Sequence, residues 1–331
     1  MQVPAIRFRG AGGVEVIASG QLDVREPGPG EVAVEVTAAG VNRADLLQRR
    51  GLYPAPPGAP ADVPGLEFSG RVVARGPGAT LWADGAAVMA IVGGGAMARR
   101  IVVHERELMP VPAGVDLVAA AAIPEAFLTA WDAMVGQAGL AGGEAVLIHA
   151  AASGVGTAAL QLARALGARA LGTTHTAAKL PRLATFGLAA EDGVVVEGGR
   201  FAAAVHARTG AGAAVILDCV GAAYFEENLR ALAPRGRLVL LGTLGGATGP
   251  APLGLLLGKR ATVIGTVMRA RPLEEKIAIA RAATALLVPM FERGLLAPVV
   301  DAVLPMAACA EAHQRLEADD TVGKLVLRWD P

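Results

Sequence analysis

Residues 145–159, which read AVLIHAAASGVGTAA, decide the fold class of this 331-residue chain. A short run of branched apolar residues is typical of a buried strand, and here it leads through small residues into a helix expected from Thr157. A helix that begins at such a turn presents free backbone N–H groups and the positive end of its dipole, which suits a pyrophosphate. Against the pattern G-x-G-x-x-G, only Gly156 is a glycine, because Ala151 and Ser153 fill the other two positions. A tight strand-to-helix turn without a ligand therefore stays the alternative.

Strand-like and helix-like stretches alternate from residue 122 onward. The expected strands are residues 145–149, 168–173, 194–196, 213–220, 237–242 and 261–267. The helices expected between them are residues 157–166, 177–186, 202–208 and 224–232. This alternation predicts an α/β protein with a doubly wound parallel sheet, and six strands make a complete dinucleotide-binding sheet. A helix (273–291), a strand (299–304), a helix (307–317) and a strand (324–328) follow, and we expect them to pack on the N-terminal part.

The first 110 residues are rich in strand signals. Residues 31–37 (EVAVEVT) alternate apolar and polar side chains, as a half-buried strand does. Further strands are expected at residues 14–17, 71–74, 88–92 and 101–103, and a short helix at 42–50. Prolines in residues 51–65 exclude regular structure there. We therefore expect a β-rich domain from residues 1–121 and 268–331, and a dinucleotide-binding domain from residues 122–267.

Composition and charge exclude several classes of protein. Thirty basic and thirty acidic side chains balance, which removes the attraction that dominates nucleic-acid binding. The two cysteines, Cys219 and Cys309, are too few for a cysteine-rich zinc site or a disulfide framework. Residues 145–163 and 238–258 are uncharged and long enough to span a bilayer, but glycines interrupt both. The N-terminal segment has no apolar signal core, so we expect a cytoplasmic protein. From the balanced charge and the interrupted apolar stretches, we expect no nucleic-acid or membrane partner.

The choice of cofactor depends on the end of the second strand of the parallel sheet. NAD-binding proteins carry an acidic residue there, which binds the ribose hydroxyls. This chain reads GTTHT at residues 172–176, without an acid, and Lys179 follows. Hydroxyl groups and a lysine are donors for a 2′-phosphate, and charge-assisted hydrogen bonds of about 1.5–3 kcal/mol would favour NADPH over NADH by roughly tenfold to a hundredfold. A solvated helix lysine is the alternative for Lys179.

Several segments together resemble one family. They are VNRADLLQRRGLY (41–53), GLEFSG (65–70), PEAFLTAWD (124–132), HAAASGVG (149–156), LDCVGAAY (217–224), LGTLGG (241–246) and VGKLVL (322–327). In this order they resemble the zinc-free quinone oxidoreductases of the medium-chain dehydrogenase/reductase superfamily, in particular the zeta-crystallin-like, tumour-suppressor-inducible type. The resemblance implies a GroES-like catalytic domain, a Rossmann domain that binds NADPH, and reduction of quinones.

The same resemblance implies that the protein uses no zinc. Zinc alcohol dehydrogenases of the superfamily carry a Cys where this chain has Asn42, and a His where it has Leu66. Without thiolate and imidazole ligands, no zinc is available to polarise an alcohol. The expected substrate is therefore an acceptor that is already electrophilic, a quinone or another conjugated carbonyl compound.

The resemblance also implies which residues form the site, in a cleft between the two domains. Tyr53 is expected to stack on the quinone or to donate its hydroxyl to it. Asn42 is expected to donate to a quinone oxygen or to hold the nicotinamide amide, and Asp45 to orient Asn42 or cap the helix. The alternatives are an exposed loop tyrosine, an N-cap asparagine and a solvated or capping aspartate. The expected cofactor-binding residues are Thr129, Ala151, Ser153, Gly154, Val155, Gly156, Thr174, Thr176, Lys179, Gly242, Leu244 and Arg269.

Two further functions stay open on the sequence. A 2-alkenal or enoyl reductase would use the same cofactor but would need a proton donor for the α-carbon. A protein that binds NADPH with little turnover is the other possibility, since some zeta-crystallin relatives have structural roles. The family also implies a homodimer or a tetramer, and the apolar strand at residues 261–267 is the expected contact.

Overall fold

The computed structural model describes residues 1–330 and divides the chain into two units. One unit comprises Met1–Leu128 together with the residues from Met268 onward, and the other comprises Thr129–Val267. The division falls inside helix α3 (Pro124–Trp131), which continues into a π-helix, η3 (Asp132–Gln137). Both units are described separately below.

A six-stranded parallel sheet forms the centre of the second unit. Its order is β10-β9-β8-β11-β12-β13, so the chain runs from the middle to one edge and then from the middle to the other. The strands are β8 (Ala145–Ile148), β9 (Arg169–Thr174), β10 (Gly193–Val195), β11 (Ala213–Asp218), β12 (Leu232–Leu240) and β13 (Thr262–Gly265). The strand order reverses between β8 and β11, and doubly wound sheets bind ligands at the carboxyl ends of the strands beside such a reversal. The expected α/β class with a doubly wound sheet is confirmed.

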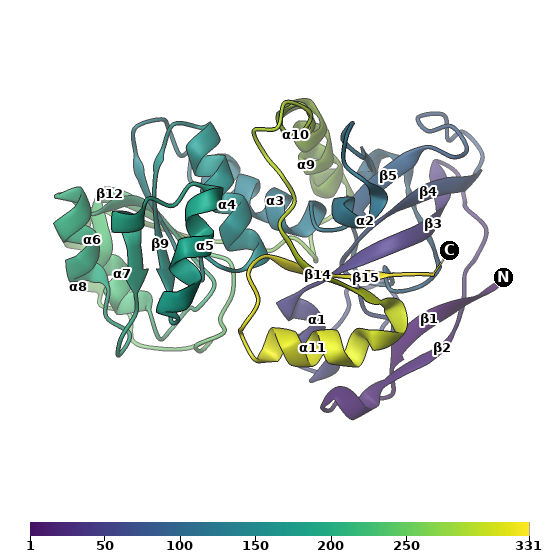
Figure 1. The fold of residues 1–331 in the computed structure, drawn as a ribbon, viewed down its shortest axis with the longest axis horizontal. Coiled ribbons are helices and arrows are strands. Elements are labelled where there is room, and N and C mark those ends of the chain that lie inside the picture. Colours follow the sequence, from purple (N-terminus) through teal and green to yellow (C-terminus); the bar gives the residue numbers. More distant parts are fainter. Residues whose placement is uncertain (331) are drawn as a thin grey trace. The chain divides into compact units, whose positions relative to one another are not determined.

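Helices cover both faces of this sheet. They are α4 (Gly154–Ala165), α5 (Leu180–Leu183), α6 (Ala202–Thr209), α7 (Phe225–Ala231) and α8 (Leu253–Lys259). Helices α6, α7 and α8 lie together on one side, while α4 and α5 lie on the other (Figure 1). Within residues 1–330, no helix combines the length and the apolar character needed to cross a bilayer.

Three local features of the second unit differ from the expectation. The helix expected at 177–186 is divided into a 3-10 turn, η4 (Ala177–Lys179), the short α5 and a second 3-10 turn, η5 (Ala184–Phe186). Pro181, which lacks a backbone N–H, lies where α5 begins, so a continuous hydrogen-bond ladder is interrupted. Helix α8 lies in a glycine- and proline-rich stretch for which the sequence predicts no helix. Strand β12 begins already at Leu232, and its register against β11 shifts before Arg237.

The first unit contains a mainly antiparallel seven-stranded sheet. Its path is β14-β15-β3-β4-β5-β7, and β6 also pairs with β3. The strands are β3 (Glu31–Val41), β4 (Glu67–Arg75), β5 (Ala87–Ile91), β6 (Arg100–His104), β7 (Met109–Pro110), β14 (Val300–Pro305) and β15 (Lys324–Arg328). Strand β3 is central, because it pairs with β15, β4 and β6. The C-terminal strand β15 thus belongs to the same sheet as the N-terminal strands (Figure 1).

A two-stranded sheet and five helices complete the first unit. Strands β1 (Gln2–Phe8) and β2 (Ile17–Asp23) form a hairpin. The helices are α1 (Arg43–Arg49), α2 (Leu117–Ala120), α9 (Leu273–Leu286), α10 (Val288–Glu292) and α11 (Cys309–Glu317). The expected strand at 14–17 is wrong in its first three residues, since Val14–Val16 form a 3-10 turn and β2 begins at Ile17. Residues 14–17 read VEVI, and a run of only four residues does not distinguish a strand from a turn.

Candidate functional site

The turn between β8 and α4 brings small residues against the carboxyl end of the sheet. Ser153 caps α4, because its Oγ accepts a hydrogen bond from the N–H of Gly156 at 3.0 Å. A Cβ at Gly156 would lie 2.5 Å from the carbonyl oxygen of Ala150, so only glycine allows the helix to start this close to the strand. The hydrogen bonds of residues 1–330 include no acceptor for the N–H groups of Gly154 and Val155. These are the donors that a phosphate group would meet.

Two neighbouring loops extend the same edge of the sheet. The loops follow β11 and β12 and are joined by backbone hydrogen bonds, with Gly245 N–H donating to Val220 O at 2.7 Å. Gly221 adopts a φ of +82°, and a Cβ there would lie 2.9 Å from the carbonyl oxygen of Gly246. Gly242 is similarly close to Cys219, with 3.2 Å from its ideal Cβ to the carbonyl oxygen. Leu244, at the tip of the second loop, is exposed.

Four further residues of the second unit are expected to bind the cofactor. Thr129 is the first residue of this unit, and Thr174, Thr176 and Lys179 lie at or just after the end of β9. The hydroxyl Oγ1 of Thr129 is buried and has no hydrogen-bond partner among residues 1–330. The Thr174 hydroxyl is used locally, because it accepts the Thr176 N–H at 3.1 Å and donates to Thr176 O at 3.3 Å. Lys179 is the last residue of η4. The glycine-lined turns and the open N–H groups fit a dinucleotide at this edge.

A buried polar network, which the sequence analysis does not identify, supports these loops. His149 contacts Thr173 Oγ1 at 2.9 Å through Nδ1 and Asn228 Oδ1 at 2.7 Å through Nε2. Asn228 donates to Asp218, whose carboxylate accepts the N–H groups of the following loop, including Val220 at 2.6 Å. Burial lowers the pKa of His149 to about 4 and raises the pKa of Asp218 to about 6. His149 is thus a neutral core residue that fixes the loop after β11.

The first unit places a buried ion cluster around Asn42. The ammonium of Lys324 lies 2.6 Å from Glu67 Oε1, 2.5 Å from Asn42 Oδ1 and 2.9 Å from Val41 O. Asn42 Nδ2 in turn donates to Glu67 Oε1 at 3.0 Å. Glu67 is 0% exposed and Lys324 is 5% exposed. The Asn42 side chain is thus bonded to a cation and an anion of the same cluster, and its expected contact with substrate or nicotinamide stays a prediction.

Asp45 links this cluster to the proline-rich segment. Its Oδ2 accepts the N–H of Asn42 at 2.8 Å, at the start of α1, and its Oδ1 accepts the N–H of Gly65 at 3.0 Å. Asp45 is completely buried, and burial raises its pKa to about 6 against the opposing effect of both hydrogen bonds. The side chain therefore holds the first turn of α1 and the end of the proline-rich loop together.

Arg269 holds the loop that carries Tyr53. Its guanidinium donates to Gly93 O at 2.7 Å, to Tyr53 O at 3.0 Å and to Gln48 Oε1 at 2.6 Å. The same guanidinium carbon lies 5.1 Å from the centre of the Tyr53 ring, in cation–π contact. Burial raises the pKa of the Tyr53 hydroxyl, so the phenol stays protonated. The buried Arg269 thus positions Tyr53, and its expected contact with the cofactor stays a prediction.

Glu125, the second residue of α3, completes the cluster. Its backbone N–H donates to Glu67 Oε2 at 2.8 Å, but its own Oε2 is buried without a hydrogen-bond partner in the described part of the chain. Burial, and secondly the neighbouring Glu67 carboxylate, raises the pKa of Glu125 to about 8. Glu67, Glu125 and Lys324 all lie within the segments quoted above, but their spacing in sequence gives no signal that they meet. Within residues 1–330, no three His, Cys, Asp or Glu side chains are arranged to hold a metal ion.

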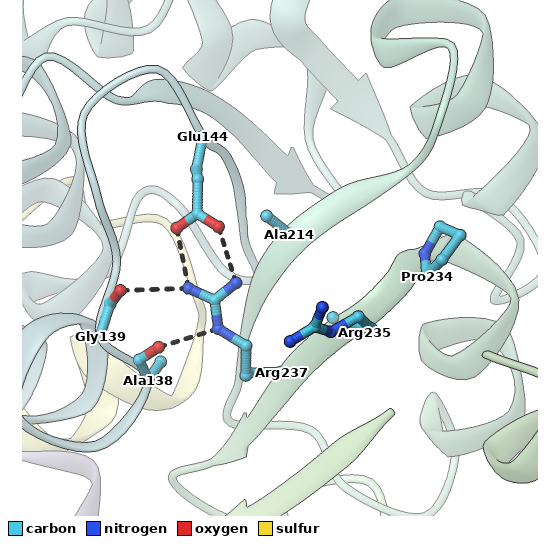
Figure 2. Close-up of a pocket in the computed structure, with 8 residues that line it drawn as sticks. Ala138, Gly139, Glu144, Ala214, Pro234, Arg235 and Arg237 are labelled. Carbon is cyan, nitrogen blue, oxygen red and sulfur yellow. Dashed lines mark hydrogen bonds and ion pairs between the residues drawn. The ribbon is translucent and has the colours of Figure 1, made fainter. Parts of the chain in front are cut away.

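A separate hollow of ≈ 470 Å³ lies at the opposite, amino end of the parallel strands. Figure 2 shows Arg237 of β12 at its centre, where the guanidinium makes two bonds of 2.8 Å to the carboxylate of Glu144. The same side chain donates to Ala138 O at 2.8 Å and to Gly139 O at 3.2 Å. Arg237 therefore ties the starts of β8 and β12 to the segment after η3. This hollow contains none of the expected site residues.

Comparisons with known proteins agree with this geometry. Residues 28–113 match the alcohol dehydrogenase GroES-like domain, and residues 154–284 match the zinc-binding dehydrogenase family. A quinone oxidoreductase of Pseudomonas aeruginosa is 34% identical over 325 residues, which cover 97% of this chain and 98% of that protein. The structure is similar to that of a quinone oxidoreductase of Pseudomonas syringae pv. Tomato DC3000, with 30% identity, a TM-score of 0.86 and coverage of 98% and 99% of the two chains.

A further structural relative is the JamJ enoyl reductase, with 26% identity, a TM-score of 0.88 and coverage of 100% of both chains. The GroES-like unit and the Rossmann unit are those of a medium-chain dehydrogenase/reductase. The chain belongs to the quinone oxidoreductase group of this superfamily, which confirms the resemblance seen in the sequence. It is an oxidoreductase of a family that uses nicotinamide cofactors.

We predict that Lys324→Gln lowers the free energy of unfolding by about 3–5 kcal/mol, because it leaves Glu67 buried without a cation. The double variant Glu67→Gln/Lys324→Gln should recover much of this loss, and urea denaturation measures both. Arg315→Gln removes a partly exposed partner of Asp301 and should change stability by about 1 kcal/mol or less. If Lys324→Gln lowered the free energy of unfolding no more than Arg315→Gln does, the buried ion pair between Lys324 and Glu67 would not stabilise the fold.

Proposed function

We propose that this protein is a zinc-independent, NADPH-dependent reductase of quinones. Hydride delivery is the chemistry that a reduced nicotinamide supplies when bound. The protein's own contribution is to hold the cofactor at the carboxyl ends of β8, β11 and β12 and to orient an electrophilic acceptor. The names of the relatives from both Pseudomonas species support this assignment of the substrate class.

The observation that carries the proposal is the composition of the Asn42 cluster. The polar groups of this cluster are the amide of Asn42, the carboxyl group of Glu67 and the ammonium of Lys324, and they are already bonded to one another. A divalent cation would have to displace the buried Lys324 ammonium, and neither a thiolate nor an imidazole is present in the cluster to bind it. An alcohol substrate would need such a cation for activation. A quinone ring accepts electrons without it.

Tyr53 is the proposed contact for the quinone ring. The ring of Tyr53 is half-buried, and Arg269 holds both its face and its backbone carbonyl. A tyrosine fixed in this way loses little conformational freedom when a planar ligand stacks on it. Because its hydroxyl is protonated, it is also available to donate to a quinone oxygen.

The test is a steady-state assay of NADPH oxidation with ortho-quinones, para-quinones and enones. We predict turnover with quinones and a hydroquinone as product, identified by chromatography. Tyr53→Phe should retain most of the activity if the ring stacks, and Tyr53→Ala should lose about tenfold or more, since stacking of aromatic groups contributes about 0.5–1.5 kcal/mol beyond area burial. No NADPH oxidation above background with any quinone would overturn the proposed function.

Reduction of 2-alkenals or enoyl thioesters is the second candidate. The similarity to the JamJ enoyl reductase favours it, and the same cofactor geometry would serve. The product distinguishes the two, because this reaction yields a saturated carbonyl compound. If enones were turned over faster than quinones, reduction of conjugated carbonyl compounds would replace quinone reduction as the leading proposal.

The NADPH preference rests on the end of β9, which carries no acidic side chain. Thr174, Thr176 and Lys179 lie there, and Lys179 is the proposed partner of the 2′-phosphate. We predict that Lys179→Glu lowers the preference for NADPH over NADH by about tenfold to a hundredfold, measured as the ratio of dissociation constants by fluorescence titration. Arg235→Glu, an exposed charge reversal at the opposite end of the sheet, is the matched control and should leave the ratio unchanged. An unaltered ratio in Lys179→Glu would exclude this role.

Association of two copies through β13 is a further part of the proposal. Strand β13 lies at the edge of the six-stranded sheet, and the exposed Val263 and Val267, with Leu253 and Leu257 of α8, form an apolar surface beside it. An unpaired, apolar edge strand is a template for pairing with another chain. A homodimer with a continuous sheet would cover it.

We predict a dimer mass in light scattering for the wild type and a monomer mass for Val263→Lys, because a charge on the edge opposes strand pairing. Val303→Lys is the control, since Val303 is also exposed on an edge strand, β14, of the other sheet. A monomeric wild type would remove the proposal.

Cys219 and Cys309 form no disulfide within residues 1–330, which is consistent with a reducing compartment. Cys309 is buried, with its Sγ 3.8 Å from Met97 Sδ, and burial raises its pKa. On this basis we propose a cytoplasmic location.

A further inference from the structure

Glu125 differs from the other two carboxyl groups of the buried cluster in its hydrogen bonds. Glu67 accepts through both oxygens, from Lys324 and Asn42 on Oε1 and from the Glu125 N–H on Oε2. Asp45 also accepts through both oxygens, from the N–H groups of Asn42 and Gly65. The buried Oε2 of Glu125 accepts from no donor in residues 1–330. If Glu125 were ionised, its buried Oε2 would have no hydrogen-bond donor within residues 1–330, whereas a protonated carboxyl group needs such a donor less.

Charged groups from several elements face Glu125. Glu67 at the start of β4 and Asp45 on α1 oppose its ionisation, while Lys324 at the start of β15 and Arg269 favour it. Burial outweighs both cations and raises the pKa of Glu125 to about 8. Glu125 is also joined to an expected substrate contact through hydrogen bonds, because its N–H donates to Glu67, and Glu67 accepts from the side chain of Asn42.

We propose that Glu125 is a catalytic acid, which carries a proton in the resting protein and donates it to the oxygen of the reduced substrate. The proposal rests on the proposed function for the identity of that substrate. A quinone that accepts a hydride becomes a hydroquinone monoanion, and the O–H bond of Glu125 breaks as a new O–H bond forms on this oxygen. The hydride supplies both electrons, so the products are a neutral hydroquinone and a Glu125 carboxylate. Water returns the proton to Glu125.

The protonation state can be measured in cofactor-free protein by infrared spectroscopy. The wild type should show the carbonyl band of a protonated carboxylic acid, which disappears as the pH rises through about 8. This titrating band should be absent in Glu125→Gln. Glu107→Gln is the matched control, because burial also raises the pKa of Glu107, which lies in η2 (Glu105–Glu107), outside the cluster. A wild-type spectrum that does not differ from that of Glu125→Gln would overturn the proposal without involving turnover.

The second readout is the pH dependence of quinone reduction. In the wild type, kcat/KM should fall as the pH rises through about 8, because the acid form is then lost. Glu125→Gln should lose about a hundredfold in kcat and lose this alkaline limb, while its dissociation constant for NADPH stays within about twofold. Glu107→Gln should retain both the rate and the limb.

A third variant separates a chemical role from a structural one. Glu125→Ala should be inactive and should recover activity when formic acid is added, since a small acid can occupy the vacated space. Failure of rescue together with a wild-type rate in Glu125→Gln would exclude Glu125 as the donor while leaving quinone reduction intact. Absence of quinone reduction in the wild type would instead refute the proposed function, and the infrared titration would still decide the protonation state.

Discussion

The first unit depends on the contacts that the buried ammonium of Lys324 makes. Its three contacts join the start of β15 to the end of β3, the N-cap of α1 and the start of β4. Through the second oxygen of Glu67, the cluster also reaches the first turn of α3. Each of these residues lies at an end of its element, where free backbone groups and changes of direction coincide. Removing two charges from water costs free energy. The hydrogen bonds that Lys324 and Glu67 make to their other partners offset this cost for the buried ion pair.

The second unit depends on close backbone approach rather than on charge. Gly156, Gly221 and Gly242 lie where a Cβ would meet a carbonyl oxygen, so the three loops at the carboxyl edge can be packed against the strands and against each other. The neutral His149 fills the space below them and holds Asn228 and, through it, Asp218. Small residues on the outside and a satisfied polar network underneath give a rigid edge whose N–H groups stay available to an anion.

The sequence predicts the second unit well because its signals are local. Branched apolar runs that end in glycine mark the six strands, and alternation with helices then determines the parallel topology. The prediction fails where local signals conflict. Glycines lie within the short helix Leu253–Lys259, and Pro181 divides the helix expected at 177–186. The register shift in β12 has no local signal at all, since it depends on pairing with β11.

The site of the first unit could be predicted only in part, for the same physical reason. Asn42, Asp45 and Tyr53 lie within twelve residues of one another, in a segment that resembles the family, and this resemblance indicates them. Glu67, Glu125 and Lys324 are distant in sequence, and only the pairing of β15 and β4 with β3 brings the first and the last together.

Their meeting also determines the chemistry of each carboxyl group. One buried ammonium serves three carboxyl groups and is bonded to Glu67, whereas Oε2 of Glu125 has no donor within residues 1–330. Burial without a donor favours the neutral form of a carboxyl group. An unequal supply of hydrogen-bond donors therefore distinguishes Glu67, which holds the ends of several elements together, from Glu125, the proposed acid.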